Sequence, residues 1–168
     1  MKVNYKNNTT SQTKLAVQEI ISQWQQGNST FELTTSGSTG KPKSISLSRD
    51  AVIASAQATL NFLHLERGTQ ALCCLPVNKI AGFMMVIRAL VGQWQLTVVE
   101  PSNKPLEGLE GESFDFAAMV PYQVENSYLQ LAQLKKLLVG GAPLRPQLEE
   151  KLKSLSLKVY HSYGMTET

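Results

Sequence analysis

The sequence predicts an α/β protein in which a largely parallel sheet is flanked by helices. Apolar runs alternate with segments of helical spacing through the second half of the chain, as in strands joined by helical crossovers. The run 71–75 is apolar at every position, which is typical of a strand buried on both faces. A chain of 168 residues that is 42% hydrophobic is also long enough for one domain with a substantial core.

The first part of the chain predicts one helix and then a hairpin. Residues 1–13 are polar and predict a loose start, whereas apolar side chains recur at helical spacing over 14–25. Gly27 follows as a stop signal. The segments 31–33 and 45–47 alternate apolar and polar residues and predict two short strands. The stretch between them is therefore expected to be a hairpin-like connection rather than a strand-to-helix turn.

A second helix and a series of strands are expected to follow. Ser48 is a good N-cap, Asp50 falls in the first turn, and an alanine-rich run continues to Leu63. His64 fits a helix C-terminus or a surface position better than a ligand position. Beyond it the pattern predicts strands at 71–75, 95–99, 115–120, 136–139 and 157–160, a loop at 101–113, and helices at 83–91, 121–131 and 144–155.

Charge and cysteine content narrow the classes of function. The net charge is only +3, and Lys and Arg are scattered without the basic run of a nucleic-acid-binding arm. Cys73 and Cys74 are adjacent in an apolar run, so we interpret them as small buried hydrophobes in a reducing compartment. The sequence has no signal-peptide core and no apolar segment of membrane length, which predicts a cytoplasmic protein.

The most informative stretch is 34–43, which combines hydroxyl side chains with two glycines and two lysines. Glycine allows the backbone to approach a ligand closely, and successive N–H groups in such a turn form a concavity that binds anions. The hydroxyls add donors and the lysines add positive charge. A polyphosphate is the ligand that this chemistry predicts.

Two other kinds of structure compete with a polyphosphate site for this stretch. Its composition alone also fits a Ser/Gly-rich surface loop. A P-loop NTPase requires two glycines separated by four residues, followed by Lys and Ser/Thr. Here Gly37 and Gly40 are too close together, and Pro42 follows Lys41 where the magnesium-binding hydroxyl should be. The sequence therefore argues against a P-loop.

Residues 35–43 resemble the phosphate-binding signature of the adenylate-forming superfamily, Thr-Ser-Gly-Ser/Thr-Thr-Gly-x-Pro-Lys. This superfamily includes acyl-CoA synthetases, luciferases and the adenylation domains of peptide synthetases. The resemblance implies that the β- and γ-phosphates of ATP bind to Thr35, Ser36, Gly37, Ser38, Thr39, Gly40, Lys41 and Lys43.

A second signature of the superfamily, Tyr-Gly-x-Thr-Glu, is matched at 163–167. By this resemblance Tyr163 stacks on adenine and Gly164 allows the base to approach. Thr166 contacts the region of the α-phosphate, and Glu167 binds Mg²⁺, so both are assigned catalytic roles. A carboxylate suits magnesium, which keeps phosphate oxygens among its other ligands. Without the first signature, the same residues would be interpreted as a frayed polar end.

A third segment, Gly140-Gly141-Ala142-Pro143, resembles the turn that lines the adenine and acyl pocket of the superfamily. Alone it is a weak signal, because many strand-to-helix turns contain glycine. Three segments in the expected order make the assignment specific. The resemblance implies that the protein is part of the large N-terminal domain of an adenylate-forming enzyme.

The segment 75–82 and the arginine that follows it resemble the o-succinylbenzoate–CoA ligases of menaquinone biosynthesis. The implied substrate-binding residues are Lys79, Ala81, Gly82 and Arg88. Arg88 would pair with a carboxylate of a dicarboxylic substrate, which suits guanidinium geometry. The alternative is that Arg88 extends to solvent. Lys79 stands where these ligases often have His, which leaves its contact open.

The resemblance also implies the reaction. In the superfamily, ATP and a carboxylic acid form an acyl adenylate and pyrophosphate, and coenzyme A then displaces AMP. ATP and CoA are therefore the expected co-substrates, and Mg²⁺ is the expected cofactor. In-line displacement at phosphorus depends mainly on positioning and on neutralising charge.

The resemblance covers roughly residues 33–168, so 1–32 are expected to form a short helical lead-in. The small C-terminal domain with its catalytic lysine has no counterpart in the 168 residues. We therefore predict that this chain alone is inactive, and that an open sheet edge favours self-association. The alternatives are another aryl- or acyl-CoA ligase, a non-catalytic nucleotide-binding fragment, and a subunit of a split enzyme.

Overall fold

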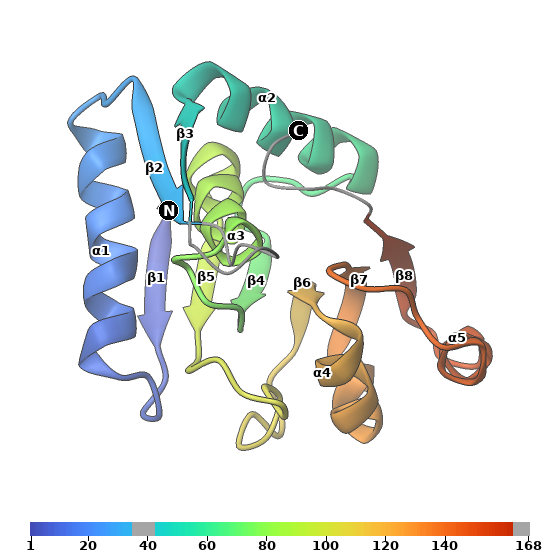
Figure 1. Ribbon diagram of the computed structural model, residues 1–168. Helices are drawn as coiled ribbons and strands as arrows, with labels where there is room; N and C mark the ends of the chain where they lie inside the picture. The colour runs from blue at the N-terminus through green and yellow to red at the C-terminus, as the bar shows by residue number, and fades with distance from the viewer. Residues whose placement is uncertain (35–42, 163–168) are drawn as a thin grey trace.

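The computed structural model describes residues 1–34 and 43–162, and its centre is a six-stranded sheet (Figure 1). In spatial order the strands are β1 (Lys2–Tyr5), β5 (Gln95–Val98), β4 (Gln70–Cys73), β6 (Phe114–Met119), β7 (Leu134–Val139) and β8 (Lys158–His161). Every neighbouring pair in this sheet is parallel. The predicted parallel α/β sheet is therefore confirmed.

A separate two-stranded hairpin lies beside the sheet. Strand β2 (Thr30–Thr34) pairs antiparallel with β3 (Ser44–Ser48). The alternation predicted from the sequence is observed, because Phe31 and Leu33 are buried while their neighbours in β2 are exposed. The hairpin-like connection is thus confirmed at its two strands, and the residues between them lie outside the described part of the chain.

Helices cover both faces of the sheet. One face carries α1 (Ser11–Gln25), α2 (Arg49–Leu63) and α3 (Ile80–Gly92), and the other carries α4 (Pro121–Asn126), the 3₁₀ helix η1 (Tyr128–Gln133) and α5 (Pro146–Lys153). Figure 1 shows α1 beside β1 and α5 beside β8, at opposite ends of the sheet. None of the helices in the described ranges is long and apolar enough to cross a membrane.

Strand β4 shows why the apolar run 71–75 belongs at the centre of the sheet. Side chains of this run alternate between the two cores, because Ala71 and Cys73 pack on the α3 side while Leu72 and Cys74 pack on the α4 side. Both cysteines are buried and neither forms a disulfide. Burial raises the pKa of the Cys73 thiol to about 12 and raises that of Cys74 further. The prediction of two buried small hydrophobes is confirmed.

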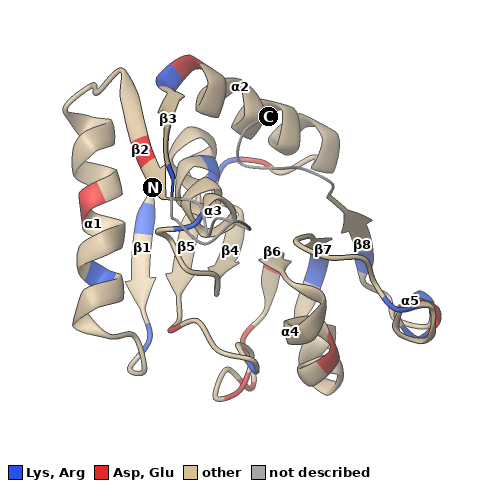
Figure 2. Ribbon diagram, in the orientation of Figure 1, with Lys and Arg blue, Asp and Glu red and all other residues tan. Residues whose placement is uncertain are grey.

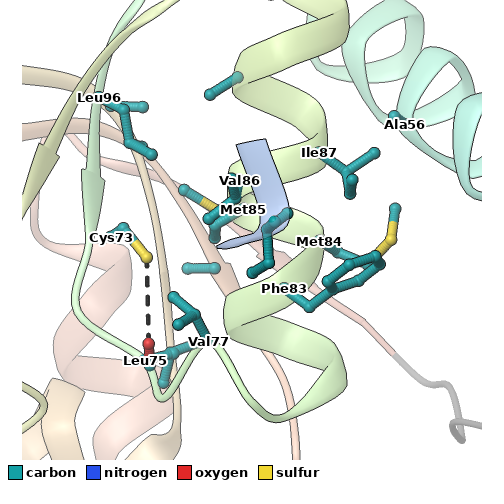
Figure 3. Packing of buried hydrophobic residues seen from close by; sticks show 14 of the residues in the cluster. Ala56, Cys73, Leu75, Val77, Phe83, Met84, Met85, Val86, Ile87 and Leu96 are labelled. Atoms are coloured by element: carbon teal, nitrogen blue, oxygen red, sulfur yellow. Dashed lines mark hydrogen bonds between the residues drawn. The ribbon is translucent and has the colours of Figure 1, made fainter. Parts of the chain in front are cut away.

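Helix α3 is buried on more than one side (Figure 3). Met85 and Val86 point toward the sheet at Leu96, whereas Met84 and Ile87 point toward α2, where Ala56 lies. Seven of its residues are buried. A helix that is apolar nearly all round must be enclosed by other elements, and α3 is enclosed by the sheet, α1 and α2.

The polar start of the chain is the clearest difference from the sequence prediction. Residues 2–5 were expected to be loose, but they form the edge strand β1 in register with β5. Backbone pairing supplies most of the contacts, since only Val3 and Tyr5 pack against the core. The Thr9 hydroxyl also donates to the Val98 carbonyl at 2.9 Å. An edge strand with one apolar face and few residues gives little periodic signal.

The helices confirm most predictions, although several of their boundaries differ from those expected. Ser48 caps α2 by accepting from the Ala51 amide, and His64 ends it in an exposed left-handed conformation with φ of 48°. The helix expected over 121–131 breaks at Ser127 into a 3₁₀ turn. The helix expected from residue 144 begins only at Pro146, because proline is favoured in the first turn of a helix.

Candidate functional site

A cavity of about 410 Å³ opens at the carboxyl ends of β4, β6, β7 and β8, between α2, α3 and the sheet. The chain continues from β4 to β5 on one side, while β6 pairs with β4 on the other side. The order of the strands therefore reverses here, and open α/β sheets bind ligands at such a switch point. The cavity is the strongest candidate site in the part of the chain that the structure describes.

One face of α3 forms a wall of this cavity. Ala81, Met84 and Arg88 line it at successive spacings of three and four residues, which places their side chains on the same helical face. Two of the four predicted substrate-binding residues, Ala81 and Arg88, are thus brought together. All other residues that line the cavity and that the structure describes are uncharged, so Arg88 supplies its only charge.

The environment of Arg88 is unusual for a guanidinium group. Its Nε is buried and has no hydrogen-bond partner among the described residues. Burial lowers the pKa of Arg88 to about 10, so the group remains charged at neutral pH. A buried cation without a partner is unfavourable by itself. The burial of Nε argues against a side chain that simply extends into bulk solvent.

Gly82 has a different part in this wall. It is buried and does not line the cavity. A Cβ atom at this position would lie 2.3 Å from the Pro76 carbonyl oxygen and 2.7 Å from that of Leu75. Glycine is therefore needed for the start of α3 to pack against the turn that follows β4. This close packing sets the direction in which Ala81 and Arg88 face.

The glycine turn after β7 forms another wall. Gly140 and Gly141 line the cavity, and a Cβ at Gly140 would lie 2.3 Å from the Ser162 hydroxyl oxygen. Gly141 has a φ of 85°, a conformation that favours glycine. The predicted turn therefore lies at the cavity, and a side chain at Gly140 would require the Ser162 hydroxyl to move.

The other half of the predicted adenine-binding turn faces a second groove. Ala142 and Pro143 line a space of about 300 Å³ together with Val120 and Tyr122. Gly141 borders both spaces. The turn thus forms a partition between the cavity that holds Arg88 and this neighbouring groove.

Two serines that were not predicted from the sequence also line the cavity. Ser162 follows β8, and Ser55 lies in α2. Ser162 could have been found, because polar residues at the carboxyl ends of parallel strands often meet at the ligand site. Ser55 gives no such signal, since a serine in an amphipathic helix is common on exposed surface.

Lys79 lies apart from the cavity lining. It occupies the N-cap position of α3, and its Nζ donates to the Thr34 carbonyl at 3.3 Å. Lys43 is exposed and precedes β3. Lys79 is therefore close to Thr34 in space, and Lys43 directly precedes Ser44 in sequence. Both lysines thus lie near the open end of the hairpin.

Many of the predicted ATP-binding residues lie outside the described residues. They are Thr35, Ser36, Gly37, Ser38, Thr39, Gly40, Lys41, Tyr163, Gly164, Thr166 and Glu167. Their roles remain predictions from the sequence. Residues 1–34 and 43–162 contain no cluster of His, Cys, Asp or Glu that could hold a metal, so the magnesium assignment rests on Glu167 alone.

Lys and Arg are distributed over several elements in Figure 2 instead of forming one basic face. Several of these cations have local partners. Lys135 pairs with Asp115 at 2.8 Å, Lys153 pairs with Glu150 at 2.9 Å, and Arg145 pairs with Glu125.

The parallel sheet and its switch-point cavity define a ligand-binding α/β domain, and comparison with known families specifies which one. The family described as AMP-binding enzyme matches residues 4–168. The chain therefore belongs to this family of adenylate-forming enzymes, and the resemblance predicted from the sequence is confirmed.

Individual relatives narrow the comparison. A 2-succinylbenzoate–CoA ligase from Staphylococcus epidermidis is 31% identical over 140 residues, which cover 80% of this chain and 30% of that protein. An acyl-CoA synthetase (AMP-forming)/AMP-acid ligase II-like protein from Dyadobacter fermentans has a crystal structure that is 43% identical, with a TM-score of 0.88. That match covers 96% of this chain and 48% of the other. The predicted likeness to o-succinylbenzoate–CoA ligases is thus also confirmed.

A further solved structure supports the fold. O-succinylbenzoate coenzyme A synthetase (MenE) from Bacillus subtilis, in complex with ATP and magnesium ion, is 22% identical and has a TM-score of 0.72. The match covers 81% of this chain and 30% of that one. The chain spans about 30% of the length of the curated relatives that it matches.

Proposed function

We propose that the protein to which this chain belongs is an AMP-forming acid–CoA ligase whose acid is 2-succinylbenzoate, with a place in menaquinone biosynthesis. Membership of the AMP-binding family supports the reaction class. The name of the Staphylococcus epidermidis relative supports the substrate. The observation that carries the substrate proposal is the buried Nε of Arg88, which has no hydrogen-bond partner among the described residues, in a cavity whose other described lining residues are uncharged.

The chemistry of the cavity suits an aromatic acid with a second carboxylate. Leu75, Ile80 and Met84 give an apolar lining, which favours burial of a ring. A carboxylate placed against Arg88 would satisfy the buried Nε and could accept two parallel hydrogen bonds. A monocarboxylic acid, whose one carboxylate is activated, would leave the Nε of Arg88 without a partner among the described residues. Arg88 therefore selects for an acid that retains a carboxylate after the other one has been activated.

The reaction then follows in two steps. The free carboxylate attacks the α-phosphorus of ATP, pyrophosphate leaves, and an acyl adenylate forms. The thiol of coenzyme A next attacks the acyl carbon and AMP leaves. Among the described residues, the apolar walls exclude water and Arg88 orients the acid, so that its reacting carboxylate points toward the carboxyl edge of the sheet.

Magnesium would be bound by Glu167 and would neutralise charge on the leaving pyrophosphate. This assignment, like the ATP contacts of residues 35–41, is supported by sequence resemblance alone. The Bacillus subtilis structure that contains ATP and magnesium ion supports the expectation that this fold accommodates both.

The direct test is pyrophosphate release by the protein in its full encoded length, with 2-succinylbenzoate as substrate. The matched control substrate is 4-oxo-4-phenylbutanoate, which lacks only the ring carboxylate. We expect 2-succinylbenzoate to be preferred, and we expect Arg88→Met to lower kcat/KM by about 30-fold or more, the effect of removing one partner of a buried charge pair. Arg88→Met should remove the preference between the two acids.

Equal activity with both acids in the wild-type protein would overturn the substrate proposal and favour another aryl- or acyl-CoA ligase. The isolated chain of 168 residues is expected to release no pyrophosphate. Activity that appears only after addition of a separate polypeptide would identify a split enzyme. Self-association is a separate proposal, which sedimentation of the isolated chain would test.

A further inference from the structure

We propose that Gln123 is a positioning residue for the acid, which holds two walls of the cavity at a fixed separation without contacting the acid itself. This inference rests on the proposed function, since it assigns Gln123 a part in binding the acid that Arg88 selects. Gln123 lies in α4, which covers the opposite face of the sheet from α3, and it does not line the cavity. Its influence on the acid would therefore pass through backbone that it holds.

The first observation is the set of hydrogen bonds made by its side-chain amide. Gln123 is 5% exposed. Its Nε2 donates to the Cys74 carbonyl at 3.1 Å and to the Ser102 carbonyl at 2.8 Å, and its Oε1 accepts from the Val120 amide at 3.2 Å. The nitrogen thus faces two carbonyls and the oxygen faces an N–H group, which fixes the orientation of the amide.

The second observation is the place where these partners lie. The pairing of β4 with β6 ends at Leu72 and Ala117, whereas β6 stays paired with β7 through its last residue. Cys74 and Val120 lie beyond the last paired residues of β4 and β6, where the cavity opens. Gln123 binds the backbone of both, so it bridges the two strand ends where the sheet ladder no longer does.

This bridge is connected to the walls of the cavity. Leu75 directly follows the residue whose carbonyl accepts from the Gln123 amide, and both Leu75 and Val120 line the cavity. On its other side Leu75 packs against the start of α3, because a Cβ at Gly82 would lie 2.7 Å from the Leu75 carbonyl oxygen. Arg88 is carried by the same helix. The amide therefore fixes the Val120 wall relative to the Arg88 wall.

The simpler explanation of Gln123 is that it caps a helix. It is the third residue of α4, and its bond to the Val120 amide is half of a capping box. Glutamate serves in a capping box as well, and a negative charge suits the start of a helix. An ionised carboxylate has no donor, however, and here it would face the carbonyls of Cys74 and Ser102. Capping accounts for one of the three bonds, and the bridge between strand ends accounts for the amide.

The test measures KM and kcat for the acid in the full-length protein. Gln123→Met keeps the length of the side chain and removes all three hydrogen bonds. We expect it to raise the KM for 2-succinylbenzoate by about 10-fold, which is less than the loss of about 100-fold that misplacement by about 1 Å can cause. A smaller folded fraction alone would lower the apparent kcat and leave KM unchanged, so KM separates positioning from stability.

Thr9→Val is the matched control. Thr9 is 4% exposed, and its hydroxyl donates to the Val98 carbonyl at the carboxyl end of β5. Neither Thr9 nor Val98 lines the cavity. This variant removes a buried hydrogen bond to a strand end at nearly constant volume, so it should lower the urea midpoint and leave the KM unchanged. If Gln123→Met fails to fold, Gln123→Asn keeps an amide that is one methylene shorter and cannot reach all three partners, and its KM should also rise.

The outcomes separate this inference from the substrate proposal. A lower urea midpoint with an unchanged KM in the Gln123 variants would show that Gln123 serves the fold alone, and would overturn the inference. An equal rise of KM in Thr9→Val would overturn it as well, because any loosening of a strand end would then suffice. A wild-type protein that activates a different acid would overturn the substrate proposal alone. A higher KM for that acid in Gln123→Met would still support the role of Gln123.

Discussion

Helices α3 and α5 cover opposite faces of the same sheet, but they carry charge in different ways. Helix α3 has seven buried residues in 13 and a single cation, Arg88, whose buried Nε has no partner among the described residues. Helix α5 has two buried residues in eight, and Lys153 pairs with Glu150 of the same helix in an exposed position. The charges of α5 are those of an ordinary solvated face.

The difference teaches where a charge indicates function. An exposed ion pair within one helix contributes little to stability, so its residues can vary without consequence for the fold. A guanidinium in the most enclosed helix opposes folding unless something pairs with it. No described protein group does so for the Nε of Arg88. A bound carboxylate is the simplest partner, which is why α3 and not α5 defines the site.

The largest loss of stability is expected from substitution of Phe83, which packs α3 against the hairpin. Its side chain is 1% exposed, and its ring centroid lies 5.4 Å from that of Phe31. Phe83→Ala should lower the free energy of unfolding by about 3–5 kcal/mol, as in other large-to-small core substitutions. Phe62→Ala is the matched control in α2, because Phe62 is 71% exposed. Urea titration of both variants checks the comparison.

A loss for Phe62→Ala that equals the loss for Phe83→Ala would contradict the view that the enclosed side chains of α3 contribute more to stability than the exposed side chains of α2. Phe62 does contact Tyr160 edge to face at 5.7 Å. An aromatic pair contributes about 0.5–1.5 kcal/mol, so the expected loss for Phe62→Ala is about 1 kcal/mol.

The next largest loss of stability is expected at Gly82, where an added side chain would collide with backbone atoms. A methyl group would lie 2.3 Å from the Pro76 carbonyl oxygen, and neither α3 nor the turn after β4 can move without disturbing the core. We expect Gly82→Ala to destabilise the fold by about 1–3 kcal/mol, the usual range for overpacking. Ala81→Ser, one residue away and exposed, should change stability by less than about 0.5 kcal/mol.

Thermal unfolding of the two variants measures this difference. If Gly82→Ala proved as stable as the wild type, the start of α3 would have to be able to shift. In that case the direction of Arg88 into the cavity would not be fixed by Gly82, and the argument from packing to substrate selection would fail.

The elements of the fold also differ in how well the sequence predicts them. The run 71–75 predicts its strand because burial on both faces requires apolar residues throughout. Strand β1 was missed, because an edge strand pairs through its backbone and only Val3 and Tyr5 reach the core. Local pattern therefore predicts elements that are buried, and it is weak for elements held mainly by backbone pairing.

The residues of the candidate site likewise differ in how well the sequence predicts them. Arg88, Gly140 and Gly141 were predicted from motif resemblance and line the cavity. Ser55 also lines the cavity but was not predicted, since its position depends on how α2 crosses the sheet. The contact between Lys79 and Thr34 joins residues 45 positions apart, and such a long-range contact cannot be deduced from spacing within one segment.

The smallest loss of stability is expected from substitution of Asp115, which lies at the amino ends of the strands, opposite to the cavity. The Asp115 carboxylate accepts from the Gln70 amide at 2.8 Å and pairs with Lys135 at 2.8 Å. Burial raises the pKa of this carboxyl, but the hydrogen bonds from Lys135 and Gln70 and the charges of Lys135 and Lys136 outweigh it. The pKa therefore lies below its ordinary value of 3.8.

The sign of the pH dependence follows from this lowered pKa. Asp115 contributes stability that is fully present above pH 3.8 and is lost as the pH falls through the lower pKa of the folded state. Asp115→Asn should therefore cost less than about 1 kcal/mol at neutral pH, since the pair is partly exposed and screened, and should cost nothing at a pH well below 3.8. Urea unfolding of both proteins from neutral to acid pH measures the difference. A difference that persists undiminished in acid would mean that the amide at position 115 disturbs the start of β4 by its shape, and that charge has no part in the effect.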